Sequence, residues 1–71
     1  MRISIEYCGM WNYYPRAASL AAEIKKETGV EAELVHSGGG VFEVEKNGEL
    51  IFSKKSLGRF PSNDEILEKL Q

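Results

Sequence analysis

The stretch RISIEYCGMWNYYPRAASLAAEIKKETGVEAELV, residues 2–35, decides the fold because it contains a strand, a helix and a second strand. In residues 2–7 apolar and polar side chains alternate, which is typical of a strand with one buried face. After Pro15, a residue suited to a first helical turn, the apolar side chains follow the spacing of one helix face: Ala17, Leu20, Ala21 and Ile24. Gly29 then favours a helix end.

The remainder of this stretch predicts a second strand parallel to the first. Residues 30–35 alternate again, and we expect Val30, Ala32 and Leu34 on the buried side. Because two strands are joined by a helix of this length, the unit predicts a parallel pair with a right-handed crossover.

The segment VFEVEKNGELIFS, residues 41–53, predicts a hairpin. Asn47-Gly48 favours a type I′ turn, which needs positive φ at both central residues. One face of the hairpin is expected to carry the apolar side chains of both arms: Phe42, Val44, Leu50 and Phe52. Further on, Ser62 and Glu65 match a capping box, which predicts the start of a final helix.

The expected order is therefore strand, helix, strand, strand, strand, helix. Every strand alternates, so one face of the sheet should be solvated and both helices should cover the other. This predicts an α/β protein, specifically an α+β two-layer sandwich with a four-stranded mixed sheet. No linker or repeat divides residues 1–71, which favours a single domain.

Composition narrows the function classes. With 71 residues and one cysteine the chain has no internal disulfide, so we expect a reducing, cytoplasmic location. We find no apolar run of membrane-spanning length and no signal-peptide pattern at the N-terminus, so we expect no membrane association. The net charge of −2, with both signs interspersed, argues against binding nucleic acid through its phosphates.

Cys8 is the main candidate for chemistry. It ends the first strand just before a helix, where free N–H groups and the helix dipole stabilise a thiolate. Gly9 would let the backbone turn sharply, and Arg16 could add positive potential. The alternative is that Cys8 is a small buried hydrophobic residue that closes the strand.

Three segments together resemble the selenoprotein W family, also called the Rdx family: EYCGMWNYYPRAASLA, GGGVFEVEKNGELIFSKK and GRFPSNDEI. The resemblance implies a small thioredoxin-like fold over nearly the whole chain. It also implies a redox centre, because the family carries Cys-x-x-Sec or Cys-x-x-Cys between the first strand and the helix. Cys8 matches the first position of that motif.

The second motif position is Trp11. A dithiol motif works because its second sulfur attacks the mixed disulfide, and an indole cannot do this. Monothiol chemistry remains: a sulfenic acid, or a mixed disulfide with glutathione or a partner protein. Trp11 is either a natural residue or stands in for selenocysteine, whose UGA codon differs by one base from the tryptophan codon UGG. The native gene product therefore has either tryptophan or, as the second interpretation, selenocysteine with its selenium at position 11.

Several neighbours of Cys8 are candidate binding residues. The resemblance implies that a glycine loop, here Gly38, Gly39 and Gly40, lies beside the cysteine and could hold a peptide or glutathione through its backbone. The loop before the helix adds Gly9, Met10, Trp11, Tyr13 and Tyr14. A short loop cannot easily bury all three of its aromatic rings. An exposed ring there would form a docking patch for a protein partner.

The remaining polar candidates are weaker. His36 is the sole histidine and ends a strand, so a surface or loop-packing role is favoured over metal binding. The segment SKKSLGRF, residues 53–60, is expected to be a solvated loop, with glutathione-carboxylate binding as the alternative.

Two functions therefore stay open. The first is a small thiol-redox protein that reacts through Cys8, with no bound cofactor. The second is a non-enzymatic protein-binding module that uses the aromatic loop, residues 11–14. The first function predicts a partly accessible Cys8 thiol. If position 11 was built for a sulfur or selenium atom, the larger indole would overpack the core, so we also expect Trp11 to be substantially exposed.

Overall fold

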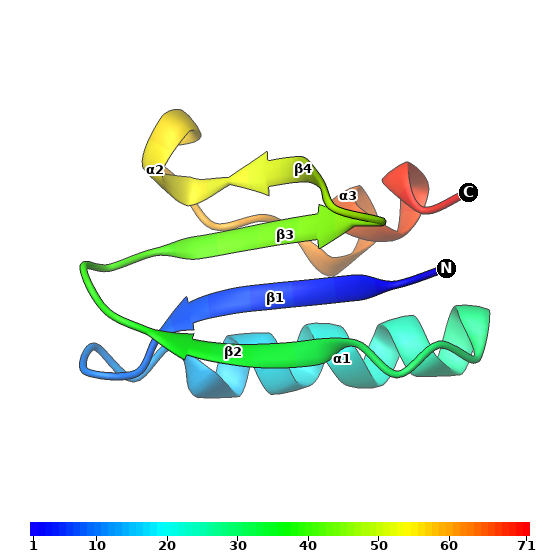
Figure 1. Ribbon diagram of the computed structural model, residues 1–71, viewed down its shortest axis with the longest axis horizontal. Coiled ribbons are helices and arrows are strands. Elements are labelled where there is room, and N and C mark those ends of the chain that lie inside the picture. The colour runs from blue at the N-terminus through cyan, green and yellow to red at the C-terminus, as the bar shows by residue number, and fades with distance from the viewer.

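The structure, a computed structural model, describes residues 1–71. Its elements follow the order β1 (Ile3–Cys8), α1 (Tyr14–Thr28), β2 (Glu33–Ser37), β3 (Phe42–Lys46), β4 (Glu49–Ser53), α2 (Lys54–Leu57) and α3 (Asn63–Lys69). Figure 1 shows the strands as one layer with α1 and α3 behind it. The expected two-layer α+β architecture is confirmed.

The sheet has the strand order β2-β1-β3-β4. β1 pairs in parallel with β2 and antiparallel with β3, and β3 pairs antiparallel with β4. The predicted parallel pair and mixed four-stranded sheet are therefore confirmed. β2 begins at Glu33, later than the predicted start, and continues through Ser37, because it pairs with the later part of β1, from Ser4 to Cys8.

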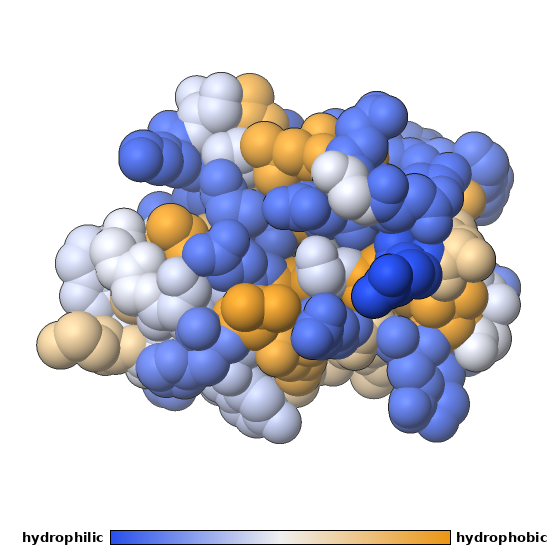
Figure 2. Space-filling model, viewed as in Figure 1, coloured by the Kyte–Doolittle hydropathy of each residue, from blue (hydrophilic) through white to orange (hydrophobic).

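The hydrophobic core lies between the sheet and the helices. Both long helices contribute to one cluster of buried side chains, so both cover the same face of the sheet: Ile3, Ile5, Tyr7, Ala17, Leu20, Ile24, Phe42, Val44, Phe52, Ile66 and Leu70. Val30, Ala32 and Leu34 are half-buried and pack against this cluster, as the alternation predicted. The opposite face is open to solvent, and Figure 2 shows it as largely hydrophilic.

The hairpin turn is confirmed, but one of its side chains lies on the other face. Asn47 and Gly48 have φ angles of 54° and 83°, the positive pair that a type I′ turn requires. A bulge shifts the register, so that Phe52 pairs with Val44 but Leu50 pairs with Glu45. The extra residue reverses the alternation, and Leu50 is exposed instead of buried.

The helix ends follow the sequence signals, with one addition. Gly29 caps α1 with a φ of 77°, and the Ser62 hydroxyl accepts a hydrogen bond from the Glu65 N–H at 3.2 Å. Part of the segment expected as a loop forms the one-turn helix α2, because the Ser53 hydroxyl caps it by accepting from the Ser56 N–H at 3.1 Å. None of the helices combines the length and apolar character that crossing a membrane requires.

Candidate functional site

Cys8 is the last residue of β1, and its main chain is tied to both neighbouring loops. Its N–H donates to the Val41 carbonyl at 2.9 Å, and its carbonyl accepts from the Tyr13 N–H at 3.1 Å. The Gly9 N–H donates to the Ser37 carbonyl at 3.0 Å. These bonds join the segment after β1 to the end of β2 and to the residue before β3. The candidate thiol therefore lies where three strands meet.

The Cys8 side chain is fully buried. The expectation of a partly accessible thiol is therefore wrong for this conformation. The side chain is absent from the core cluster, and strand alternation places it with Ser4 and Glu6, away from the helix-covered face. The thiol is thus shielded at the end of the sheet, where the adjoining loops are hydrogen-bonded to the main chain of Cys8 and Gly9.

A tight turn separates Cys8 from α1. The Asn12 N–H donates to the Gly9 carbonyl at 3.2 Å, and Asn12 has a φ of 60°. Asparagine tolerates this left-handed conformation better than most residues. Asn12, rather than Gly9 as expected, therefore provides the unusual backbone geometry of the turn.

Gly9 is required for a different reason, which involves His36. A Cβ added at Gly9 would lie 1.9 Å from Nε2 of His36, so the imidazole occupies the space that a side chain would need. The same ring meets the edge of Tyr7, with centroids 5.7 Å apart. His36 is exposed and its ring packs over Gly9, so the predicted surface or loop-packing role is confirmed. The structure contains no group of three His, Cys, Asp or Glu side chains that could hold a metal ion.

Trp11 lies on the glycine loop that follows β2. A Cβ added at Gly40 would lie 2.3 Å from Cζ3 of Trp11, and Gly40 has a φ of 72°. Gly40 is therefore doubly constrained, while Gly38 and Gly39 have open space where a side chain would be. Trp11 itself remains 60% exposed, as predicted. The structure thus brings Trp11 and the glycine loop together beside Cys8.

The other residues of the aromatic loop take different positions. Tyr13 packs against the core, with its ring centroid 4.7 Å from that of Phe60. Tyr14 and Met10 remain exposed, and the Tyr14 ring meets the edge of Tyr7 at 5.7 Å. The expectation that the loop could not bury all its rings is confirmed.

Phe60 was not identified from the sequence. It contacts the Arg16 guanidinium, which lies 4.2 Å from its ring centroid, and the Lys54 ammonium, at 5.3 Å. Arg16 thus lies over Phe60. No sequence signal could have indicated this cluster, because its members are separated by up to 44 positions along the chain and share no periodicity.

The α1 N-terminus is set back from the thiol. The helix starts at Tyr14, its N-cap Tyr13 makes no side-chain capping bond, and Pro15 removes one N–H of the first turn. Cys8 therefore precedes the helix in the sequence, as expected, but the turn and the N-cap residue Tyr13 separate it from the first turn of α1.

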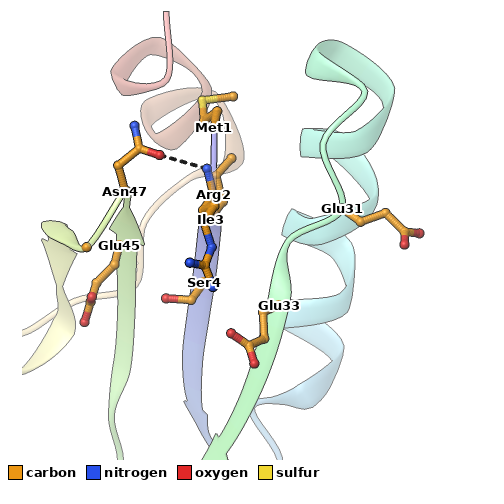
Figure 3. A pocket seen from close by; sticks show the side chains of 9 residues that line it. Met1, Arg2, Ile3, Ser4, Glu31, Glu33, Glu45 and Asn47 are labelled. Carbon is orange, nitrogen blue, oxygen red and sulfur yellow. Dashed lines mark hydrogen bonds between the residues drawn. The ribbon is translucent and has the colours of Figure 1, made fainter.

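A separate depression of about 740 Å³ lies at the other end of the sheet. Figure 3 shows Glu33 and Glu45 on the two sides of Ser4, with the Arg2 N–H donating to Oδ1 of Asn47 at 2.8 Å. The depression begins beside the start of β1, about 16 Å along the strand from Cys8. It is therefore not part of the Cys8 site.

Comparison with known proteins places this geometry in a family. Residues 2–71 match the Rdx family. The chain is 36% identical over 72 residues to migration and invasion enhancer 1 of Bos taurus, and it spans 63% of the length of that relative. It is 31% identical over 74 residues to selenoprotein W of Danio rerio, with 99% of this chain and 86% of that protein covered.

Solved structures agree with this assignment. A crystal structure of a Bordetella parapertussis protein superposes with a TM-score of 0.92 at 32% identity, covering 97% of this chain and 91% of the other. A selenoprotein W-related protein from Vibrio cholerae superposes with a TM-score of 0.83 at 32% identity, covering 96% and 89%. The sheet and the helices are thus those of a thioredoxin-like protein, and the chain belongs to the Rdx family and is related to selenoprotein W.

Proposed function

We propose that this chain is a small cytoplasmic thiol-redox protein that reacts through Cys8. The observation that carries the proposal is the position of Cys8 at the end of β1, with a tight turn and Trp11 following it, in a fold of the Rdx family. Its relationship to selenoprotein W supports a chalcogen chemistry at this loop. No bound cofactor is required for it.

The proposed reaction is a thiol–disulfide exchange. Cys8 loses its proton to solvent, and the thiolate attacks one sulfur of glutathione disulfide or of a partner protein's disulfide. A bond forms between Sγ of Cys8 and that sulfur, the original S–S bond breaks, and the other sulfur leaves as a thiolate that takes up a proton. Because Cys8 is the sole cysteine, the product remains a mixed disulfide until another thiol attacks it.

Burial of Cys8 adds a step before the exchange. The thiol is inaccessible while the main-chain bonds to Ser37, Val41 and Tyr13 persist. Reaction therefore requires local opening of the loop, residues 9–13, at a free-energy cost below that of global unfolding. Selenocysteine at position 11 of the native gene product remains part of the proposal, because most of the Trp11 side chain is exposed and a smaller side chain there would leave no cavity in the core.

Mass spectrometry tests the reaction. The native protein is incubated with glutathione disulfide, and the expected product carries one added glutathione, which Cys8→Ser lacks. The same incubation in denaturant confirms that the thiol itself is competent. If the mass changes only in denaturant, the thiol-redox proposal fails.

The second candidate function is a non-enzymatic protein-binding module. The observation that favours it is the contrast between a buried Cys8 and the exposed side chains of Met10, Trp11 and Tyr14. Alkylation distinguishes the two functions. Labelling of Cys8 in the native protein faster than global unfolding supports redox chemistry, whereas labelling at the rate of global unfolding supports the binding module.

A further inference from the structure

The acidic side chains of this protein avoid one end of the molecule. All 11 aspartates and glutamates lie outside three segments, residues 7–22, 34–42 and 50–63. The turns of these segments meet where β1, β2 and β4 end and β3 begins, at the left of Figure 1. We call this region the acid-free end. It has a positive character although the whole chain has a net charge of −2.

Three cations at the acid-free end have no carboxylate partner. The ion pairs of the structure are Lys25–Glu31 and Arg59–Glu65, so they do not involve Arg16, Lys54 or Lys55. Two carboxylates border this end and bind uncharged donors: those of Glu6 and Glu43 accept hydrogen bonds from serine hydroxyls at 2.7 Å, and Glu43 also accepts from the Lys55 main-chain N–H at 3.5 Å. The three cations are therefore available to an external anion.

Aromatic contacts hold two of these cations in place. The Arg16 guanidinium lies over Phe60, and the Lys54 ammonium is 5.3 Å from the Phe60 centroid and 5.5 Å from that of Tyr13. Such cation–π contacts reduce the conformational freedom that binding an anion would otherwise remove. The charge at this end is thus partly preorganised.

Exposed apolar side chains adjoin the cations. Trp11 contacts Tyr13 edge to face with centroids 6.2 Å apart, and Tyr13 contacts Phe60, so an aromatic row connects the exposed indole to the cations. Met10, beside Trp11, is 87% exposed. Tryptophan, tyrosine, methionine and arginine are the residue types enriched in protein interfaces. Surfaces of this composition are typical of docking sites.

We propose that the acid-free end docks an acidic polypeptide segment. Its carboxylates would pair with Arg16, Lys54 and Lys55, and an apolar side chain would lie against Met10 and Trp11. Charge complementarity selects this occupant, because an acidic segment is repelled by the carboxylates elsewhere and attracted here, which also fixes its orientation. The inference goes beyond the proposed function, since docking requires no thiol.

Tryptophan fluorescence provides a direct test, because Trp11 is the sole tryptophan. The protein carries Cys8→Ser, so that disulfide chemistry and docking are separated. The probe is a synthetic peptide of alternating glutamate and leucine, compared with a peptide in which lysine replaces glutamate. The acidic peptide should shift Trp11 emission to shorter wavelength in a saturable manner, with weaker binding at higher salt. Equal binding of both peptides would overturn the proposal.

Two double variants with the same net charge test the location. Arg16→Gln with Lys54→Gln removes two cations from the acid-free end, whereas Lys26→Gln with Lys46→Gln removes two from the far ends of α1 and β3. The first should weaken peptide binding roughly two- to thirtyfold, the range for two exposed ion pairs, and the control should not. Equal affinities would refute the assignment.

Two further measurements keep the test decisive. If the first double variant does not fold by circular dichroism, Lys55→Glu replaces it, because that exposed side chain takes part in no ion pair. Vesicles of phosphatidylserine and phosphatidylcholine form the other arm. A Trp11 shift with vesicles but not with the acidic peptide would assign the surface to a membrane and overturn the proposal.

Discussion

Gly39 and Gly40 form a matched pair that isolates one contact of the candidate site. Their φ angles are 71° and 72°, so alanine at either position would have to adopt a left-handed φ. They differ in their surroundings. An alanine Cβ at Gly40 would lie 2.3 Å from the Trp11 ring, and at Gly39 nothing lies within 4 Å. Gly40→Ala should therefore destabilise the protein more than Gly39→Ala.

The difference can be worked out from the exposure of Trp11. Left-handed backbone costs alanine about 1–2 kcal/mol at either position. Trp11 is 60% exposed, so displacing its ring exposes at most the remaining part. For a side chain that buries up to about 250 Å², that part is roughly 100 Å². At about 25 cal/mol per Å², the additional loss for Gly40→Ala is at most about 2.5 kcal/mol.

Urea unfolding followed by circular dichroism measures both variants. Gly39→Ala should lose about 1–2 kcal/mol of unfolding free energy, and Gly40→Ala more by up to about 2.5 kcal/mol. Trp11 emission should move to longer wavelength in Gly40→Ala alone. In a Trp11→Ala background the difference between the two glycine substitutions should shrink. Equal losses in the presence of Trp11 would refute the inference that the indole is anchored on Gly40.

Three further predictions concern other parts of the molecule. Trp11→Cys should fold and, under mild oxidant, lose both free thiols within the monomer by forming a disulfide with Cys8; retention of both thiols would show that the turn lacks the required geometry. The hydrogen bond from Arg59 lowers the pKa of Glu65 to about 2, below its unfolded value of about 4.5, so the pair stabilises the fold above pH 4.5 and this contribution is lost as the pH falls towards 2. The difference in urea midpoint between wild type and Glu65→Gln should shrink over that range, and a constant difference would contradict the ion-pair contribution. Leu50→Ser should change the unfolding free energy by less than about 0.5 kcal/mol, because the bulge leaves Leu50 exposed. A larger loss of unfolding free energy would show that Leu50 belongs to the core.

Most of the fold could be predicted because its signals are local. Asn47-Gly48 specifies its turn through the φ angles of two adjacent residues, and Ser62 caps α3 through a bond to a residue three positions later. The exposed position of Leu50 could not be predicted, because a bulge depends on how two strands pair. The one-turn helix α2 was missed for a similar reason, since a short polar segment with a serine before it is equally compatible with a loop.

The candidate site could be located from the sequence but not described in detail. Cys8 was identified from its place between a strand and a helix, Trp11 from the resemblance to the selenoprotein W motif, and the exposure of Trp11 from the size of its indole. The burial of Cys8 depends on loops held by two hydrogen bonds, from Cys8 to Val41 and from Gly9 to Ser37, whose partners are about 30 positions away in the chain. Contacts of this kind have no periodicity, and a side chain's accessibility is therefore the least predictable property of such a loop.

The two edge strands of the sheet, β2 and β4, differ in how readily another strand could pair with them. At the β4 edge the strand is interrupted by the bulge, and the Lys69 ammonium donates to the Ile51 carbonyl at 2.9 Å. Both features hinder the addition of another strand. At the β2 edge no side chain bonds to the main chain of Glu33–Ser37. Sheet growth, including the first step of aggregation under destabilising conditions, should therefore proceed from β2 alone.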